Sequence, residues 1–476
     1  MIPILSGNVA SALGGAYEVA NSCRFDDGSS AYMHKTPGSA GDQQKFTFSF
    51  WIKRCGIATG TAMTIFDTQA DDDNQFKIRF NDNGTLTVES KVSDHNDSLV
   101  TTQVFRDPSA WSNFVIAVDT TQGTAGNRVK IYHNGTQITA FGTENYPAED
   151  LNTLVNAANK LYVGTSAQTD AYCDMYIAEF CLVDGSQLAA TSFGEFDEDS
   201  PTIWKPKDVS GLSFGTNGFY LDFEDSSNLG NDANGGTDLT EVNLAATDLC
   251  SDSPTNNFCV LNPLDNYYQG ATFSEGNCKL VTAGSSNTAP TLGTFGLTAG
   301  KWYWEVKFVS DSQGSSYGVI GIEGAQVTSA LDALLEGTQS YGLYLNDGKI
   351  WTNNSANNHG AHIDLNAIIG VALDLDNNRI YFSKDGNWGD GSGNWDESTP
   401  NNYLSITDPA SVALGAYFPA HGDWSSGTIG WEVNFGNPVH SISSGNADAN
   451  GYGNFEFSVP SGYLSLCSKN LGSDGG

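Results

Sequence analysis

Basic residues are scarce in this chain. Only 21 of its 476 residues are Lys or Arg, against 55 Asp and Glu, which gives a formal net charge of −34 at pH 7. A field of that sign repels phosphate backbones and anionic membrane surfaces, so the composition argues against a nucleic-acid partner. We take solubility in a salty medium as the main consequence of the acidity, with cation sites or cationic partners as the alternative.

Long apolar runs and clustered metal motifs are also missing. No stretch approaches the roughly 18 apolar residues that a membrane span needs, and the first fifteen residues lack the basic segment of a secretory signal. The cysteines follow neither a CxxC pattern nor zinc spacing. We expect a protein without a membrane span, made in a reducing cytoplasm with free thiols. The eight cysteines are Cys23, Cys55, Cys173, Cys181, Cys250, Cys259, Cys278 and Cys467.

Helical periodicity is almost absent, whereas apolar residues alternate with a period of two from residue 46 onward. Phe46, Phe48 and Phe50 fall on one face of an expected strand. Residues 327–336 have the pattern of a short amphipathic helix and residues 147–155 are a weaker candidate. No βαβ alternation occurs, so the sequence predicts an all-β protein with antiparallel sheets. Further strands are expected at 76–80, 129–133, 219–223, 302–308, 380–382 and 431–435. Asn-Gly or Asp-Gly hairpin turns are expected at 83–84, 134–135, 347–348 and 385–386.

Six segments of the first 220 residues form an ordered pattern: CRFDDGSSAY (23–32), FTFSFWIK (46–53), WSNFVIAV (111–118), VKIYHNGT (129–136), LYVG (161–164) and MYIAEF (175–180). This pattern resembles the laminin-G/pentraxin-like concanavalin family. The resemblance implies an antiparallel jelly-roll sandwich. In it, the strands of Trp51 and Trp111 would supply the bulky layer between the sheets, and Gly164 and Gly185 would mark bends.

A second pattern begins after residue 263 and includes KWYWEVK (301–307), YGVIGI (317–322), YGLY (341–344), IGVALDLDNNRIYF (369–382) and WEVNFG (431–436). It looks like a SPRY domain. The two resemblances together predict two antiparallel β-sandwiches in series. The expected order is an anchoring arm (1–15), a laminin-G/concanavalin-like sandwich (16–223), an extended connector (224–262), a SPRY sandwich (263–471) and a short tail (472–476).

Segments between the two patterns, and near the end of the second, point to a smaller group of proteins that carry both domains. WKPK (204–207), FGTNGFYLDF (214–223), NLGND (228–232), SPTNN (253–257) and PSGY (460–463) with KNL (469–471) are similar to paired lectin-like/SPRY proteins of tailed phages, many of them marine. In that family the proteins are virion components, as tail fibres or capsid surface decorations.

That resemblance implies a non-catalytic virion protein made in the host cytoplasm and attached to other virion proteins through its N-terminal arm. It would bind host surface glycans or stabilise the particle, as a homo-oligomer with a trimer favoured. A secreted carbohydrate-binding lectin and a concanavalin-fold glycosidase remain as alternatives.

An acidic triplet is the first candidate for a metal site. Asp71, Asp72 and Asp73 crowd together before Phe76, at the expected mouth of a hairpin. Carboxylate oxygens suit Ca²⁺, which tolerates irregular geometry. A plain acidic turn is the competing interpretation. Asp385 to Asp390 also resembles a cation loop but lacks the alternate ligands of an EF-hand.

Aromatic residues outside the alternating faces are the main candidates for ligand binding. Trp388 and Trp395 flank a loop that contains Asp390, and His421 with Trp424 is expected in a second loop. Sugar rings stack on indole while their hydroxyl groups need polar partners. The competing interpretation is that these side chains cover the edges of the core.

A catalytic carboxylate pair is the remaining candidate. Laminarinase-type enzymes carry Glu-x-Asp-x-x-Glu on one strand, and the nearest string here is Glu195-Phe-Asp197-Glu-Asp-Ser200. Because Ser200 stands where the second glutamate is needed, we favour a solvated acidic loop. The sequence therefore predicts no catalytic residue.

Overall fold

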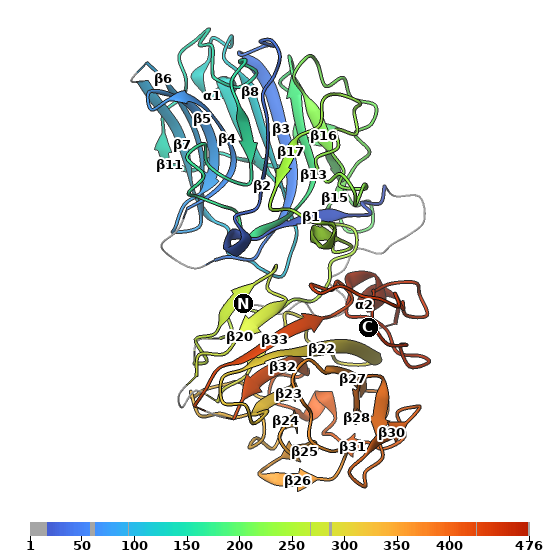
Figure 1. Ribbon diagram of the computed structural model, residues 1–476. Helices are drawn as coiled ribbons and strands as arrows, with labels where there is room; N and C mark the ends of the chain where they lie inside the picture. The colour runs from blue at the N-terminus through green and yellow to red at the C-terminus, as the bar shows by residue number, and fades with distance from the viewer. Residues whose placement is uncertain are drawn as a thin grey trace. The chain divides into compact units, whose positions relative to one another are not determined.

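The computed structural model describes residues 17–57, 62–93, 95–266, 268–284, 288–424 and 426–474 (Figure 1). The chain divides between Thr255 and Asn256 into two compact parts, an N-terminal unit and a C-terminal unit. The expected anchoring arm, residues 1–15, lies outside the described residues, and so do residues 475 and 476 of the expected tail.

The N-terminal unit consists of two eight-stranded antiparallel sheets and one small hairpin. The first sheet contains β1 (Ser22–Phe25), β3 (Lys45–Arg54), β8 (Ser112–Asp119), β9 (Val129–His133), β10 (Thr136–Ile138), β13 (Met175–Asp184), β16 (Phe219–Leu221) and β18 (Leu249–Cys250). The second contains β2 (Tyr32–Lys35), β4 (Met63–Asp71), β5 (Asn74–Phe80), β6 (Thr85–Val92), β7 (His95–Val104), β11 (Phe141–Glu144), β12 (Leu161–Val163) and β17 (Thr240–Val242). The hairpin pairs β14 (Gly194–Phe196) with β15 (Trp204–Pro206).

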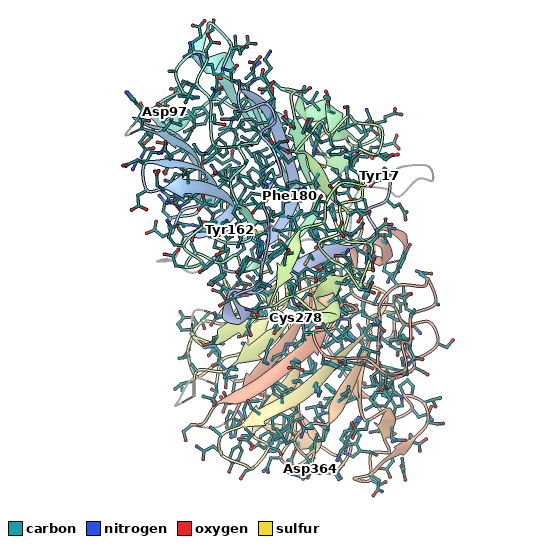
Figure 2. The ribbon with its side chains drawn as sticks, turned by 45° about the horizontal axis from the view of Figure 1, so that its top comes forward. Tyr17, Asp97, Tyr162, Phe180, Cys278 and Asp364 are labelled. Carbon is teal, nitrogen blue, oxygen red and sulfur yellow. The ribbon has the colours of Figure 1, made fainter. Side chains whose placement is uncertain are left out.

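The core of this unit lies between its two sheets, as alternation on β3 predicts. Phe46, Phe48 and Phe50 are fully buried there, and Phe180 from β13, labelled in Figure 2, stacks on Phe50 with ring centroids 5.4 Å apart. Each buried Phe adds roughly 1.5–3 kcal/mol of hydrophobic stabilisation. The prediction of an all-β sandwich is confirmed here.

The opposite face of the first sheet is covered as well. Trp51 and Trp111 pack there in a second buried cluster with Trp204. The strand of Trp51 does supply bulky side chains to the layer between the sheets, as expected, but through its phenylalanines, because residues on alternate positions of β3 point to opposite faces. The Asn134-Gly135 turn confirms the predicted hairpin: Gly135 has a φ of +74°, and a Cβ there would lie 2.3 Å from the Trp204 ring.

The segment expected as an extended connector adds strands to the N-terminal unit. β17 pairs with β2, and β18 pairs with β1. Asp252 then places its carboxylate 2.7 Å from the Lys53 ammonium. The N-terminal unit thus extends to Thr255, and the polar composition of residues 224–255 belongs to sheet edges and turns.

The C-terminal unit consists of a nine-stranded and a six-stranded antiparallel sheet. The larger sheet contains β19 (Thr272–Ser274), β20 (Lys279–Val281), β22 (Lys301–Asp311), β27 (Ile368–Asp374), β28 (Arg379–Lys384), β29 (Asn387–Gly389), β30 (Trp395–Glu397), β31 (Leu404–Ser405) and β33 (Ile429–Asn434). The smaller contains β21 (Thr291–Leu292), β23 (Gly318–Glu323), β24 (Ser340–Tyr344), β25 (Lys349–Thr352), β26 (Ser355–Asn357) and β32 (Phe418–Asp423).

Alternation on β22 builds the core of this unit. Trp302, Trp304 and Phe308 point into the main cluster. On the other face, the buried Glu305 carboxylate accepts hydrogen bonds from the backbone N–H groups of Glu456 and Phe457. Burial raises the pKa of Glu305. This carboxylate therefore fixes the C-terminal segment over the outer face of the sheet.

Helices are few and short among the described residues. They are α1 (Ala125–Arg128), α2 (Ser468–Asp474) and the 3-10 turns η1 (Asp27–Ser29), η2 (Ala190–Ser192), η3 (Ala246–Asp248) and η4 (Pro409–Ser411). None of the helices described combines the length and apolar character that crossing a membrane requires. All eight cysteines are buried as free thiols.

The predicted helix at residues 327–336 is wrong. The segment forms successive turns, in which the Asp332 carboxylate accepts hydrogen bonds from the N–H groups of Thr328 and Ser329. Leu334 and Leu335 are buried against the smaller sheet. Local side-chain hydrogen bonds of this kind compete with helix formation.

Candidate binding site

The acidic triplet forms part of the β4–β5 turn. Asp71 Oδ1 accepts hydrogen bonds from Asp73 N at 3.0 Å and from Asn74 Nδ2 at 2.7 Å, while Asp73 lies 2.9 Å from the Lys91 ammonium. Within the part of the chain that the structure describes, no three His, Cys, Asp or Glu side chains converge as a metal site would require. The geometry favours the acidic turn over the expected Ca²⁺ site.

Glu195 lies on β14, in the hairpin outside the two sheets of the sandwich. Its side chain is 51% exposed and lies 3.6 Å from Lys205 Nζ, which also contacts Asp197 at 3.6 Å. Asp197 accepts hydrogen bonds from the N–H groups of Asp199 and Ser200, and these bonds lower its pKa. The acidic string therefore begins on β14, where the sequence predicts a loop, and Asp197 caps the turn that follows.

Trp388 and Trp395 lie on neighbouring strands but pack against different clusters. Trp388, on β29, is buried with Tyr303 on the outer face of the larger sheet. Trp395, on β30, packs against the main core and donates a hydrogen bond from Nε1 to Ala361 O at 2.9 Å. The two indoles do not form one platform for a sugar ring.

Asp390 holds the turn between these two strands. Its carboxylate accepts hydrogen bonds from Asn394 Nδ2, Asn394 N and Ser392 N at 2.9, 3.0 and 2.6 Å. These bonds lower the pKa of Asp390 to about 2. A carboxylate engaged in this way stabilises the loop, whatever the loop contacts.

The expected second loop is in fact strand β32. His421 is fully buried on this strand, between β21 and β23, and burial lowers its pKa to about 3. The placement of His421 in a loop is therefore wrong. Trp424 follows the strand and is 37% exposed. Of the five predicted ligand-binding residues, it has the most accessible aromatic ring.

The structure contains a cavity of about 250 Å³ in the C-terminal unit that the sequence did not indicate. We call it the Gln269 pocket. Gln269 is completely buried, and neither its Oε1 nor its Nε2 has a hydrogen-bond partner among the described residues. A buried amide without partners costs roughly 1–3 kcal/mol. Its lining is Asp265, Asn266, Tyr268, Gln269, Ala289, Pro290, Gln326, Val327 and Thr328.

Three separate segments build the Gln269 pocket. Asn266 closes the turn that contains Gln269, since its backbone and side-chain oxygens accept from Gly270 N at 2.8 Å and Ala271 N at 2.9 Å. Ala289 N donates to Ala330 O at 3.2 Å, which joins the second segment to the third. The pocket wall is thus fixed by backbone hydrogen bonds.

The lining suits an uncharged polar ligand. A primary amide offers two N–H donors and a carbonyl acceptor, while Tyr268 and Pro290 provide apolar contact. Asp265 is the single carboxylate among the described residues of the lining. The volume lies below the roughly 300–1,000 Å³ of drug-sized sites, so it fits a group the size of one sugar ring.

Sequence comparison assigns each unit separately. Residues 27–190 match the Laminin_G_3 model, described as the concanavalin A-like lectin/glucanases superfamily. Residues 301–391 match the model of the SPRY domain. No curated protein matches the chain.

The solved structures that the chain matches include the SPRY domain of human HERC1, at 16% identity, 36% coverage of this chain, 96% coverage of that chain and a TM-score of 0.27. Another is the native heptameric SAP-like pentraxin from Limulus polyphemus, at 13% identity, 37% and 80% coverage and a TM-score of 0.27. On the family matches, the chain carries a concanavalin A-like domain and a SPRY domain in series.

Proposed function

We propose that this protein is a non-catalytic, lectin-like binding protein whose C-terminal unit holds a neutral sugar residue in the Gln269 pocket. The observation that carries the proposal is the fully buried Gln269 amide, which has no partner among the described residues. An apolar side chain of similar size would avoid the cost of burying that amide. Ligand hydroxyl groups that pair with it would explain why an amide stands there, and this pairing requires the neighbouring side chains to shift, since the amide has no accessible surface without ligand.

The residues that line the Gln269 pocket favour a neutral sugar as ligand rather than a charged molecule. Sugar hydroxyl groups both donate and accept hydrogen bonds, which matches an amide, and the apolar face of a sugar matches Tyr268 and Pro290. Non-catalytic binding is supported by the turn-capping role of Asp197 and the exposed position of Glu195.

In this proposal the protein lies on the virion surface, as a tail fibre or a capsid decoration. It attaches to host glycans or stabilises the particle. The support is the phage-like pattern of segments such as WKPK at 204–207 and SPTNN at 253–257. Residues 1–15 would contact other virion proteins, and the chain would assemble as a trimer. Electron microscopy of particles labelled with antibodies against this chain tests the setting, and unlabelled particles would contradict it.

A glycan array with the full-length chain tests the binding function. The Gln269→Met variant preserves side-chain size but removes the amide, so we expect it to lose binding to the neutral glycans that the wild type retains. Gln339→Met is the matched control, because Gln339 Oε1 accepts a hydrogen bond from Ala413 N at 2.8 Å and lies outside the lining. Binding by the control with no binding by Gln269→Met supports the pocket.

Two other results would redirect the proposal. Loss of binding in Trp424→Ala, with Gln269→Met still binding, would place the glycan site at the exposed indole. Hydrolysis of β-glucans that disappears in Glu195→Gln would make the N-terminal unit a glycosidase. A secreted lectin would bind the same glycans but would be recovered from the medium of its producing cells rather than from particles.

A further inference from the structure

A buried arginine at the end of β3 forms no direct ion pair among the described residues, although the charge of Asp174 favours its cationic form. Arg54 is 6% exposed, and its Nη1 and Nη2 donate hydrogen bonds to Phe105 O at 2.6 Å and Gly56 O at 3.0 Å. Its Nε is buried without a hydrogen-bond partner in the part of the chain that the structure describes. The guanidinium also lies 4.4 Å from the centroid of the Phe80 ring.

This guanidinium lines a second cavity of about 250 Å³, which lies within the N-terminal unit and which we call the Arg54 pocket. Burial lowers the pKa of Arg54 to about 10, so the side chain stays cationic at neutral pH. Buried charges in proteins are generally paired, because desolvation of a lone ion is costly. The residues relevant to ligand binding are Arg54, Gln103, Arg106, Trp111, Ser112 and His133.

The Arg54 pocket holds a second arginine, a histidine and one carboxylate. Arg106 is exposed, and its Nη2 donates to Asn83 O at 2.6 Å. His133 contacts Gln103 Nε2 and Ser112 Oγ, both at 3.3 Å, and burial lowers its pKa to about 4, so it is neutral at pH 7. Asp107 also lines the pocket, but its Oδ1 accepts from Ser109 N at 2.8 Å.

We propose that the Arg54 pocket binds the carboxylate of an acidic sugar, such as a uronic acid residue. A guanidinium matches the planar carboxylate, while Gln103 and Ser112, which His133 holds in place, can pair with hydroxyl groups. The indole of Trp111 provides apolar surface beside them. A single negative charge suits a chain of net charge −34 better than a dianion does, because the surrounding field repels anions.

Saturation-transfer difference NMR on the full-length chain tests this site, with D-glucuronate and D-glucose as probes. We expect signals from glucuronate and none from glucose in the Gln269→Met background, which separates this site from the Gln269 pocket. Equal signals from the two sugars would contradict recognition of the carboxylate. Displacement of glucuronate by an equal concentration of inorganic phosphate would also overturn the proposal, since it would indicate a general anion site.

A variant that reverses the charge of Arg106, at the rim of the Arg54 pocket, tests the proposed site. Arg106→Glu should weaken glucuronate binding at least about tenfold, because it places a like charge beside the ligand. Lys130→Glu, on β9 of the same unit and outside the lining, changes the net charge equally and should bind like the wild type. Arg54→Met removes the hydrogen bonds to two backbone carbonyls and can impair folding, so unchanged binding by a folded Arg106→Glu variant decides against the proposal.

Discussion

The Lys53 ammonium lies 2.7 Å from the Asp252 carboxylate, and both side chains are fully buried. The other carboxylate oxygen of Asp252 accepts a hydrogen bond from Trp111 Nε1 at 2.8 Å. These contacts join strand β3 to a segment far along the chain, just before the end of the N-terminal unit. They explain why residues 224–255 fold with that unit.

Removing the Asp252 carboxylate should strongly destabilise the N-terminal unit. Loss of one partner of a buried ion pair costs about 3–5 kcal/mol, and the Trp111 indole would lose its acceptor as well. We expect Asp252→Ala to lower the free energy of unfolding by that amount in urea denaturation followed by tryptophan fluorescence.

Asp73→Ala is the matched control, because Asp73 pairs with Lys91 at 2.9 Å but is 57% exposed. Exposed pairs contribute about 0–1 kcal/mol. A similar loss of stability in the two variants would contradict the special role of the buried pair.

Glu179 should make the stability of the N-terminal unit depend on pH. Burial raises its pKa from the ordinary 4.5 to about 7, and the Tyr17 and Tyr220 hydroxyl groups donate to its carboxylate. Between pH 4.5 and 7 the folded protein retains a proton that the unfolded chain has released. Raising the pH through this window therefore lowers the free energy of unfolding, by up to about 3 kcal/mol.

The Glu179→Gln variant isolates this contribution, since an amide does not titrate. We expect the wild type to lose more stability than Glu179→Gln when urea denaturation is repeated at pH 5 and pH 8. Equal losses in the two proteins would show that Glu179 does not carry the pH dependence.

Gln269→Met should raise stability while it removes binding. The buried amide has no partners to lose among the described residues, so replacing it with an apolar side chain should increase the free energy of unfolding by about 1–3 kcal/mol. Gln339→Met should instead destabilise the C-terminal unit, because it leaves Ala413 N without its acceptor. Differential scanning calorimetry without ligand measures both, and a destabilised Gln269→Met would indicate that the amide has a structural partner.

Removal of divalent cations should leave the thermal midpoint unchanged. The carboxylates of Asp71 and Asp73 are engaged within their own turn and with Lys91. We expect the same midpoint with excess EDTA and with millimolar CaCl₂. A Ca²⁺-dependent increase that disappears in Asp71→Ala would restore the predicted metal site.

Strand positions could be predicted because buried faces impose a period of two. The alternation of Phe46, Phe48 and Phe50 predicts a strand, and these residues lie on β3; the predicted strand at 129–133 is β9. Alternation does not say which tryptophan faces which layer, since both faces of the first sheet are buried. It therefore does not indicate that Trp51 and Trp111 lie in the second cluster, apart from the phenylalanines of β3.

His421 was misplaced because its neighbours Pro419 and Gly422 are typical of loops. The structure accommodates Pro419 within β32 by placing Gly293 opposite, where a Cβ would lie 3.3 Å from the proline ring. The Gln269 pocket could not be predicted either, because its walls come from segments about 20 to 60 residues apart. Nothing in the local sequence marks Gln269 as a buried amide.

The most direct test of the proposed function is a crystal structure of the full-length chain with the best-binding neutral oligosaccharide from the array. We expect one sugar ring in the Gln269 pocket, with its hydroxyl groups about 2.7–3.2 Å from both Gln269 Oε1 and Nε2. A sugar bound elsewhere, with only water beside the Gln269 amide, would contradict the proposed function.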